Sequence, residues 1–150
     1  MPTATDASVA RLDRTTAHAI HSVPSVPTCL ALLWVTKCSL RALGFTRTRR
    51  WMETRAARWE PSGERGAALA QQIDYAVSVA AAIYPGRALC LEQSLTLLYL
   101  LRRRGFNATL RLGARPQPFY AHAWVECDGE PVNDTREHLR EFAVLPDHRP

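Results

Sequence analysis

The stretch CLEQSLTLLYLL, from Cys90 to Leu101, constrains the fold more than any other part of this 150-residue chain. Its apolar residues lie nearly all round a helix, and such a helix has to be covered on most of its faces. The arginines at 102–104 suit the negative end of a helix, and Gly105 suits the position after it. The sequence therefore predicts a buried helix over about Leu89–Arg104 with other layers packed around it.

Helical spacing in two earlier segments predicts part of that covering. One helix is expected over Pro27–Leu43, ended by Gly44, and another that includes Leu69–Ile83, stopped by Pro85-Gly86. Beyond Gly105 the apolar period changes to two, which is typical of strands. The expected strands are Thr109–Leu112, Phe119–Glu126 and Pro131–Asp134. Helices first and a small antiparallel sheet afterwards make the fold class α+β.

The chain has the length of one domain and can bury a core of its own. We expect a helical region over residues 1–83 and a core over residues 84–150, packed together as one compact domain. The first residues, up to about position 25, are rich in Ser, Thr, Ala and Pro, and either a short helix or a mobile arm fits them.

The formal net charge of +5 would suit nucleic acid, a membrane surface or an acidic partner. Lys37 is the single lysine and the other basic residues are arginines, which favours a codon bias over a binding surface. The arginines cluster in Thr46–Trp59 and at 102–104, and we expect a solvated face or a helix end there. An acidic peptide partner is the alternative, and no nucleic-acid partner is expected.

The four cysteines, Cys29, Cys38, Cys90 and Cys127, form no CxxC pair. The chain opens without the basic and apolar pattern of a secretory signal, so we expect free thiols and a cytoplasmic location. The apolar stretch Cys29–Val35 is too short for a bilayer, which needs about 20 apolar residues. No stable membrane insertion is expected.

Cys90 lies in the first turn of the predicted buried helix. A helix N-terminus carries partial positive charge and unpaired N–H groups, which favour the nucleophilic thiolate and can receive an oxyanion. Glu92 would oppose this if it pointed inward, so we expect it to face outward or to bind an N–H group. Taken alone, a cysteine in such a helix is more often a small buried apolar residue.

His122 lies in a predicted strand, where alternate residues share a face. If the following turn has three residues, Cys127 to Gly129, with Gly129 in the left-handed conformation, His122 faces Asp134 across the hairpin, with Cβ atoms about 5 Å apart. A two-residue turn at Asp128-Gly129 would place Asp134 on the opposite face. A pairing of His122 with Asp134 therefore requires the longer loop or a bulge.

Together these residues fit a thiol nucleophile (Cys90), a general base and acid (His122) and an acid that fixes the histidine tautomer (Asp134). A zinc site from Cys90, His122 and Cys127 is an alternative. It is disfavoured because Cys127 has the opposite strand parity to His122. We expect no cofactor and no resident metal.

Three motifs, CLEQSL, LRRRG and AHAWVE, are similar to those of the transglutaminase-like cysteine proteases of lasso-peptide biosynthesis, which remove leader peptides. The likeness covers about Tyr84–Leu145. It implies a transglutaminase- or papain-like core in which Cys90 is the nucleophile, His122 the base and Asp134 the third member.

The resemblance further implies a cysteine endopeptidase that cuts the leader from a ribosomally made lasso-peptide precursor. It implies a separate leader-recognition protein and a macrolactam cyclase as partners. The region before Tyr84 lacks the hairpin of a winged-helix recognition module, so we expect the stand-alone form. Its N-terminal helices would be the docking surface, with the arginines of 47–58 meeting an acidic leader or partner. An acyltransferase or transglutaminase-like enzyme on the same triad, and a non-catalytic precursor-binding module, are the alternatives.

Overall fold

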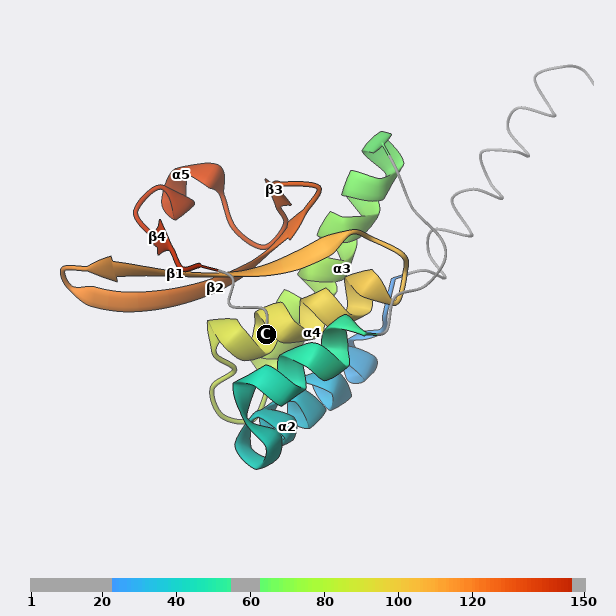
Figure 1. Ribbon diagram of the computed structural model, residues 1–150. Coiled ribbons are helices and arrows are strands. Elements are labelled where there is room, and N and C mark those ends of the chain that lie inside the picture. The colour runs from blue at the N-terminus through green and yellow to red at the C-terminus, as the bar shows by residue number, and fades with distance from the viewer. Residues whose placement is uncertain (1–22, 55–62, 147–150) are drawn as a thin grey trace, which may run out of the picture.

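A computed structural model describes residues 23–54 and 63–146, and the expectations for the first 22 residues and for the arginines beyond Thr54 in the basic stretch lie outside these ranges. The chain forms helices followed by a small antiparallel sheet (Figure 1), which confirms the α+β class. The elements are α2 (Val26–Glu53), α3 (Gly63–Ile83), α4 (Cys90–Arg102), β1 (Ala108–Pro116), β2 (Phe119–Cys127), β3 (Glu130–Pro131), α5 (Arg136–Leu139) and β4 (Ala143–Val144).

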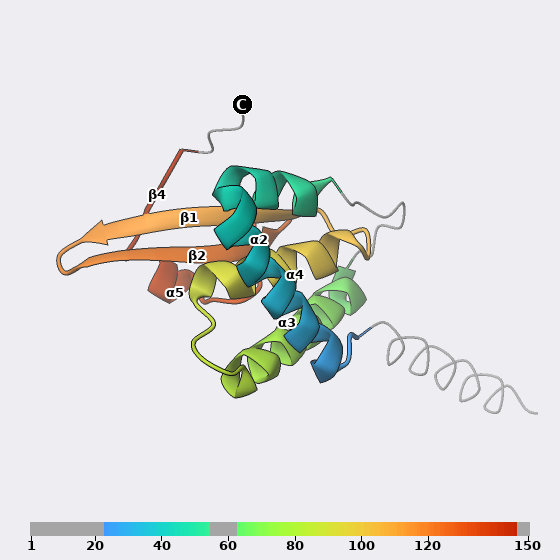
Figure 2. The same ribbon diagram turned by 90° about the horizontal axis from the view of Figure 1, so that it is seen from below.

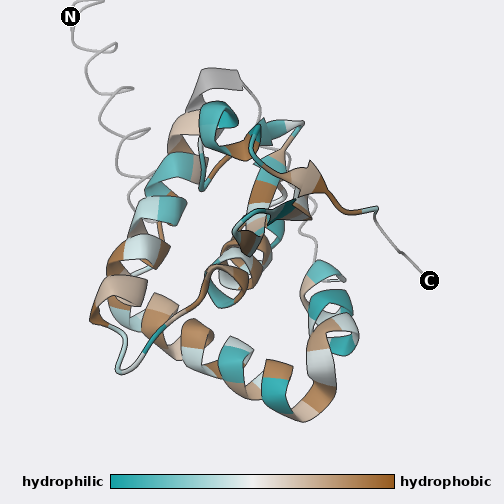
Figure 3. Ribbon diagram, turned by 90° about the vertical axis from the view of Figure 1, so that its left-hand side faces the viewer, coloured by the Kyte–Doolittle hydropathy of each residue, from teal (hydrophilic) through white to brown (hydrophobic). Residues whose placement is uncertain are grey.

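Helix α2 is longer than the sequence predicted. Its start is capped by Ser25, whose hydroxyl accepts from the Thr28 N–H group. Gly44 breaks the helical geometry at φ 75°, as expected, but a second helical segment then runs on to Glu53. Figure 3 shows the chain turning sharply between the two segments, the second of which is mostly hydrophilic. A glycine suits this corner because φ is positive there.

Within the described ranges, α2 is the one helix long and apolar enough to cross a membrane. The apolar segment is therefore longer than the stretch Cys29–Val35, which the sequence analysis expected to be too short for a bilayer. Its inner face is nevertheless part of the protein core: Cys29 and Leu33 are buried, and the hydroxyls of Thr36 and Thr96 hydrogen-bond to each other at 3.0 Å. Core helices of soluble proteins can be as long and as apolar, so length and composition alone do not place α2 in a membrane.

Helix α4 lies between the sheet and the helices α2 and α3 (Figure 1), and it packs against all of them. Its leucines at 95, 97, 98 and 101 are fully buried, which confirms the predicted central helix. Arg102 at its end donates from Nε to the Ala108 carbonyl at 2.9 Å and from Nη1 to the Glu53 carbonyl at 2.9 Å. Arg102 thus binds backbone carbonyls at the end of α4, which agrees with the prediction that the arginines at 102–104 lie at a helix end.

The sheet has the order β3-β2-β1-β4, and all neighbouring strands are antiparallel. The β1–β2 hairpin extends beyond the helices (Figures 1 and 2). On the inner face Ala123 and Val125 join the core over α4, as the strand parity predicted. On the outer face Trp124 is buried over Gly113, where a Cβ atom would lie 2.9 Å from the indole ring. The buried position of the Trp124 side chain therefore requires a glycine at position 113.

Candidate active site

Helix α4 begins at Cys90, and the thiol is partly buried. The preceding residue, Leu89, is extended, and its N–H group donates to the Glu92 carboxylate. This confirms that Glu92 binds an N–H group rather than opposing a Cys90 thiolate. The first N–H groups of the helix have no intrahelical partner, so they remain donors beside the sulfur. The Gln93 amide donates to the Ala88 carbonyl at 2.9 Å, which holds the loop before the helix.

Two hydrogen bonds fix how α4 lies along the sheet. Near its start the Ser94 hydroxyl donates to the Ala123 carbonyl at 2.9 Å. At its end Arg102 binds the Ala108 carbonyl, and Ala108 is paired with Cys127. The helical distance between the two contacts is about 12 Å at about 1.5 Å per residue. The strand distance is about 13 Å at about 3.3 Å per residue. The helix therefore runs alongside β2 in the same direction.

The same alignment gives the level of Cys90 on the sheet. Cys90 precedes Ser94 by one helical turn, which is about 6 Å. About two strand residues span that distance, so the start of α4 lies level with Ala121 and His122. Figures 1 and 2 agree, since the start of α4 points toward the tip of the β1–β2 hairpin in both views.

His122 and Asp134 are in direct contact. The distance from Nε2 of His122 to Oδ2 of Asp134 is 2.6 Å, and their side chains are 13% and 11% exposed. The structure thus brings together the histidine and the aspartate that the sequence analysis paired, although by a different route.

Of the two turns that the sequence left open, the structure has the two-residue one, and not the three-residue turn on which the expected pairing of His122 with Asp134 depended. Cys127 pairs directly with Glu130, and Asp128 and Gly129 have φ values of 52° and 84°. Positive φ at both central residues is the two-residue type I′ turn, for which Asp-Gly is a favoured sequence. Continued regularly, this register would put Asp134 on the face opposite to His122. The predicted strand Pro131–Asp134 is reduced to the two residues of β3.

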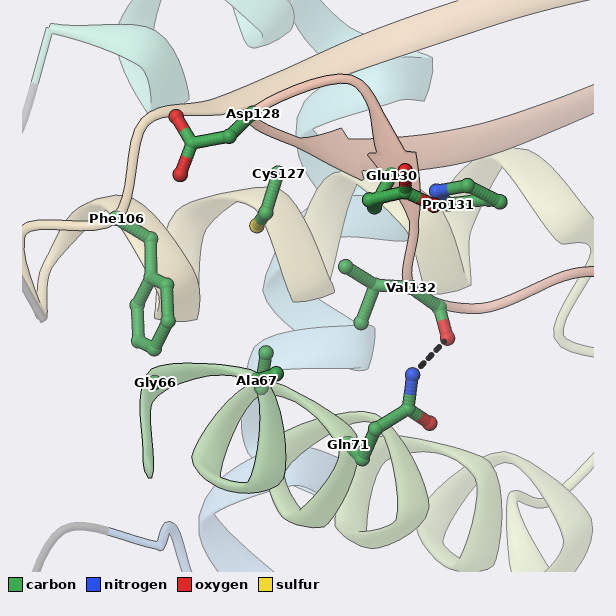
Figure 4. Close-up of a pocket in the computed structure, with 10 residues that line it drawn as sticks. Gly66, Ala67, Gln71, Phe106, Cys127, Asp128, Glu130, Pro131 and Val132 are labelled. Atoms are coloured by element: carbon green, nitrogen blue, oxygen red, sulfur yellow. Dashed lines mark hydrogen bonds between the residues drawn. The ribbon is translucent and has the colours of Figure 1, made fainter. Parts of the chain in front are cut away.

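A bend after Val132 changes the side to which Asp134 turns. The Val132 N–H group still donates to the Val125 carbonyl at 2.9 Å. The Val125 N–H group, however, donates to the side-chain oxygen of Asn133 at 2.8 Å. The Val132 carbonyl, released from the sheet, accepts from Gln71 Nε2 of α3 at 3.1 Å (Figure 4). Asn133 also donates to the Ser94 hydroxyl at 3.0 Å, so α3 and α4 both hold the bend.

Asp134 binds a second histidine that the sequence analysis missed. Nδ1 of His138 lies 2.9 Å from each oxygen of Asp134, and the Thr135 N–H group donates to Oδ1 at 2.7 Å. Burial alone would raise the pKa of Asp134, but the hydrogen bonds from Thr135, His138 and His122 outweigh it and leave the pKa below its usual value. Asp134 is therefore a carboxylate at neutral pH. The sequence carried a signal for this contact: His138 follows Asp134 by four residues, and Thr135 between them is the N-cap of α5.

Aromatic rings surround the imidazole of His122. The ring centroids of Tyr120, Trp124 and Phe142 lie 6.2, 6.0 and 5.3 Å from it. Its other nitrogen, Nδ1, is buried and has no hydrogen-bond partner in the part of the chain that the structure describes. Because Asp134 engages Nε2, Nδ1 is the nitrogen left to exchange a proton with a substrate or a nucleophile.

The alternative zinc set is not supported. Among the described residues, the group of potential ligands that lie together is His122, Asp134 and His138, with ligand atoms within 4.8 Å of one another. Such a spacing could hold one metal ion. In the structure, however, the Asp134 oxygens already bind both imidazoles, so an ion would have to displace these hydrogen bonds.

Cys127 lies in a different place, in a pocket of about 260 Å³ between α3 and the β2–β3 turn (Figure 4). Burial, with a smaller effect of the Asp128 charge, raises the pKa of the Cys127 thiol to about 12. Burial also raises the pKa of Cys29, whereas Cys38 is exposed. All four cysteines are free thiols, and Cys90 is the one at a helix start.

The sequence matches the transglutaminase-like superfamily over residues 32–147. The chain belongs to this superfamily. This transglutaminase-like protein is also 39% identical to the microcin J25-processing protein McjB of Escherichia coli over 56 residues, which are 37% of this chain and 27% of McjB. The match thus spans about a quarter of that relative's length. No solved structure gave a significant match.

Proposed function

We propose that this transglutaminase-like protein is a cysteine endopeptidase that removes the leader from a ribosomally made lasso-peptide precursor. The observation that carries the proposal is the His122–Asp134 pair, which lies level with the start of the helix that bears Cys90. Nδ1 of His122 has no hydrogen-bond partner among the residues that the structure describes. McjB is named for processing a peptide, and the similarity to it supports a role in peptide maturation. Four free cysteines fit a reducing cytoplasm.

In the proposed reaction the Cys90 thiol gives its proton to Nδ1 of His122, and the thiolate attacks the scissile carbonyl carbon. The N–H group of Cys90, at the helix start, stabilises the oxyanion. The C–N bond breaks as His122 protonates the departing amine, which leaves an acyl thioester on Cys90. Water then attacks the thioester with His122 as base, and the leader departs with a new carboxylate. Asp134 accepts the Nε2 hydrogen of His122 throughout and so fixes the tautomer.

We further propose that leader recognition comes from a separate protein and that a macrolactam cyclase takes up the product. The exposed arginines Arg47 and Arg50, on the second segment of α2, offer positive charge for an acidic leader or partner. A double charge reversal, Arg47→Glu with Arg50→Glu, should weaken capture of the leader-bound recognition protein at low salt. Equal capture by the reversed variant would remove this surface from the proposal.

The test is incubation with a candidate precursor, with and without its recognition protein, followed by mass spectrometry. Hydrolysis gives leader and core whose masses sum to the precursor plus one water. An acyltransferase on the same residues would instead give a leader joined to an added amine. Cys90→Ala should abolish cleavage while keeping the thermal midpoint, and the exposed Cys38→Ala is the matched control that should cleave normally. Cleavage retained by Cys90→Ala would end the proposal.

A thiol probe separates an enzyme from a non-catalytic binding module. Because Cys38 is exposed and would react for that reason alone, the experiment uses a Cys38→Ser background. Cys90 should then react with iodoacetamide faster than Cys29 and Cys127, and His122→Ala should slow it. A Cys90 no more reactive than the two buried cysteines favours the binding module.

A further inference from the structure

The backbone of β2 alternates in the direction of its hydrogen bonds, as in any antiparallel strand. Val125 directs both its N–H and its C=O toward the β3 side, where they meet Asn133 and Val132. By the alternation, Ala123 and Ala121 direct their N–H and C=O groups to the same side. The strand β3 pairs with Glu126 and Cys127, and farther along β2 no strand of residues 23–54 or 63–146 covers this side, which is a free edge there.

The free edge is closed at one end and open at the other. The Ala123 carbonyl accepts the Ser94 hydroxyl, so helix α4 covers that position. Two residues farther on, Ala121 is exposed, and the structure records no hydrogen bond to its backbone on this side from any described residue. An unpaired N–H and C=O on a strand edge form a template for an added extended strand.

The open position lies beside the candidate catalytic residues. Ala121 directly precedes His122, and the alignment of α4 with β2 puts Cys90 level with it. A peptide strand paired with Ala121 would therefore run between the edge of β2 and the start of α4. Its carbonyl groups would pass the N–H groups of the first turn of the helix.

We propose that Ala121 binds an extended segment of the peptide substrate through its backbone N–H and C=O, as a strand added to the edge of β2. This proposal rests on the proposed peptidase function and names the form in which the substrate is bound. The site recognises main chain, so it takes an unfolded polypeptide segment and excludes a folded loop or a small amine. It holds the scissile carbonyl over Cys90 by pairing rather than by a side-chain pocket.

The test replaces Ala121 by proline, which removes the outward N–H group and fills the edge with its ring. Proline is tolerated on a strand edge when its N–H would face outward. Ala121→Ser, which keeps the N–H group, is the matched control. We expect kcat/KM for precursor cleavage to fall about tenfold or more in Ala121→Pro, because a hydrogen bond at the site is lost and its partner stays unpaired. The rate of Cys90 alkylation and the thermal midpoint should be unchanged.

A second measurement uses the unaltered protein and so does not depend on the folding of a variant. Precursor peptides are N-methylated at one backbone amide at a time around the cleavage site. Cleavage should fall at the position facing the Ala121 carbonyl and be little affected at the neighbouring amides, which point away from the edge. Equal tolerance at every position, or equal cleavage by Ala121→Pro and Ala121→Ser, overturns the proposal. If Cys90→Ala abolishes cleavage while these results are negative, the peptidase function stands and only the edge pairing fails.

Discussion

Replacing Asn133 by alanine should destabilise the protein far more than a usual asparagine substitution. The Asn133 side chain stands in for a missing strand, since it accepts from the Val125 N–H group and donates to the Ser94 hydroxyl. Val125 and Ser94 are both fully buried, so neither group can turn to water instead. The substitution leaves the Val125 donor without a partner inside the core.

The expected magnitude follows from these two contacts. A buried donor left unsatisfied costs about 1–3 kcal/mol, and the second hydrogen bond contributes about 1 kcal/mol. We therefore expect the free energy of unfolding to fall by about 2–4 kcal/mol. In proteins of this size about 1 kcal/mol shifts the thermal midpoint by about 2–4 °C, so a fall of about 5–15 °C is expected. Cleavage should fall as well, because the bend held by Asn133 directs Asp134 to His122.

The assay is urea unfolding followed by tryptophan fluorescence, with precursor cleavage measured on the same samples. The matched control is Asn107→Ala, which removes an exposed hydrogen bond of 3.1 Å to Asp128 at the neighbouring turn. Its cost should stay below about 0.5 kcal/mol. An Asn133→Ala protein as stable as the Asn107→Ala protein would refute the idea that this side chain holds the bend.

Three further predictions concern other groups. The pKa of Asp134 is depressed in the folded state, so its contribution to stability is present above the ordinary value of 3.8 and is lost as the pH falls through the lower folded value. Urea unfolding between pH 5 and about 2 should therefore show a steeper loss of stability for the wild type than for Asp134→Asn. Gly113→Ala should cost about 1–3 kcal/mol in unfolding free energy, since the new Cβ would lie 2.9 Å from the Trp124 ring, and an unchanged midpoint would contradict this. Burial holds the pKa of Cys127 at about 12, so a disulfide reagent at pH 8 should label exposed Cys38 first and Cys127 only after unfolding; equal rates in the folded protein would be inconsistent with that burial.

Local patterns predicted the parts of the fold that depend on neighbours in the chain. The all-round apolar helix, its start at Cys90 and the alternation of β2 follow from spacing that any reader of the sequence can count. The two short elements α5 and β4 were missed. Each has too few residues for a pattern, and β4 exists only because Ala143 and Val144 pair with β1.

The turn at Asp128-Gly129 shows where local information ends. Asp-Gly suits a two-residue turn, and glycine after it also suits a three-residue turn, so the sequence located the turn without deciding its length. The structure has the shorter turn, in which Glu126 faces Pro131 instead of Glu130. Glu130 instead forms an ion pair with Arg136.

The sequence by itself determined that Cys90 stands at a helix start and that His122 lies on a strand, because both depend on residues within one turn or one strand of them. Only the tertiary structure decided that Asp134 meets His122. The bend that joins them is held by Gln71 and Ser94, which are 61 and 39 residues away from their partners Val132 and Asn133. Contacts over such separations come from the packing of α3 and α4 against the sheet, and no local spacing encodes them.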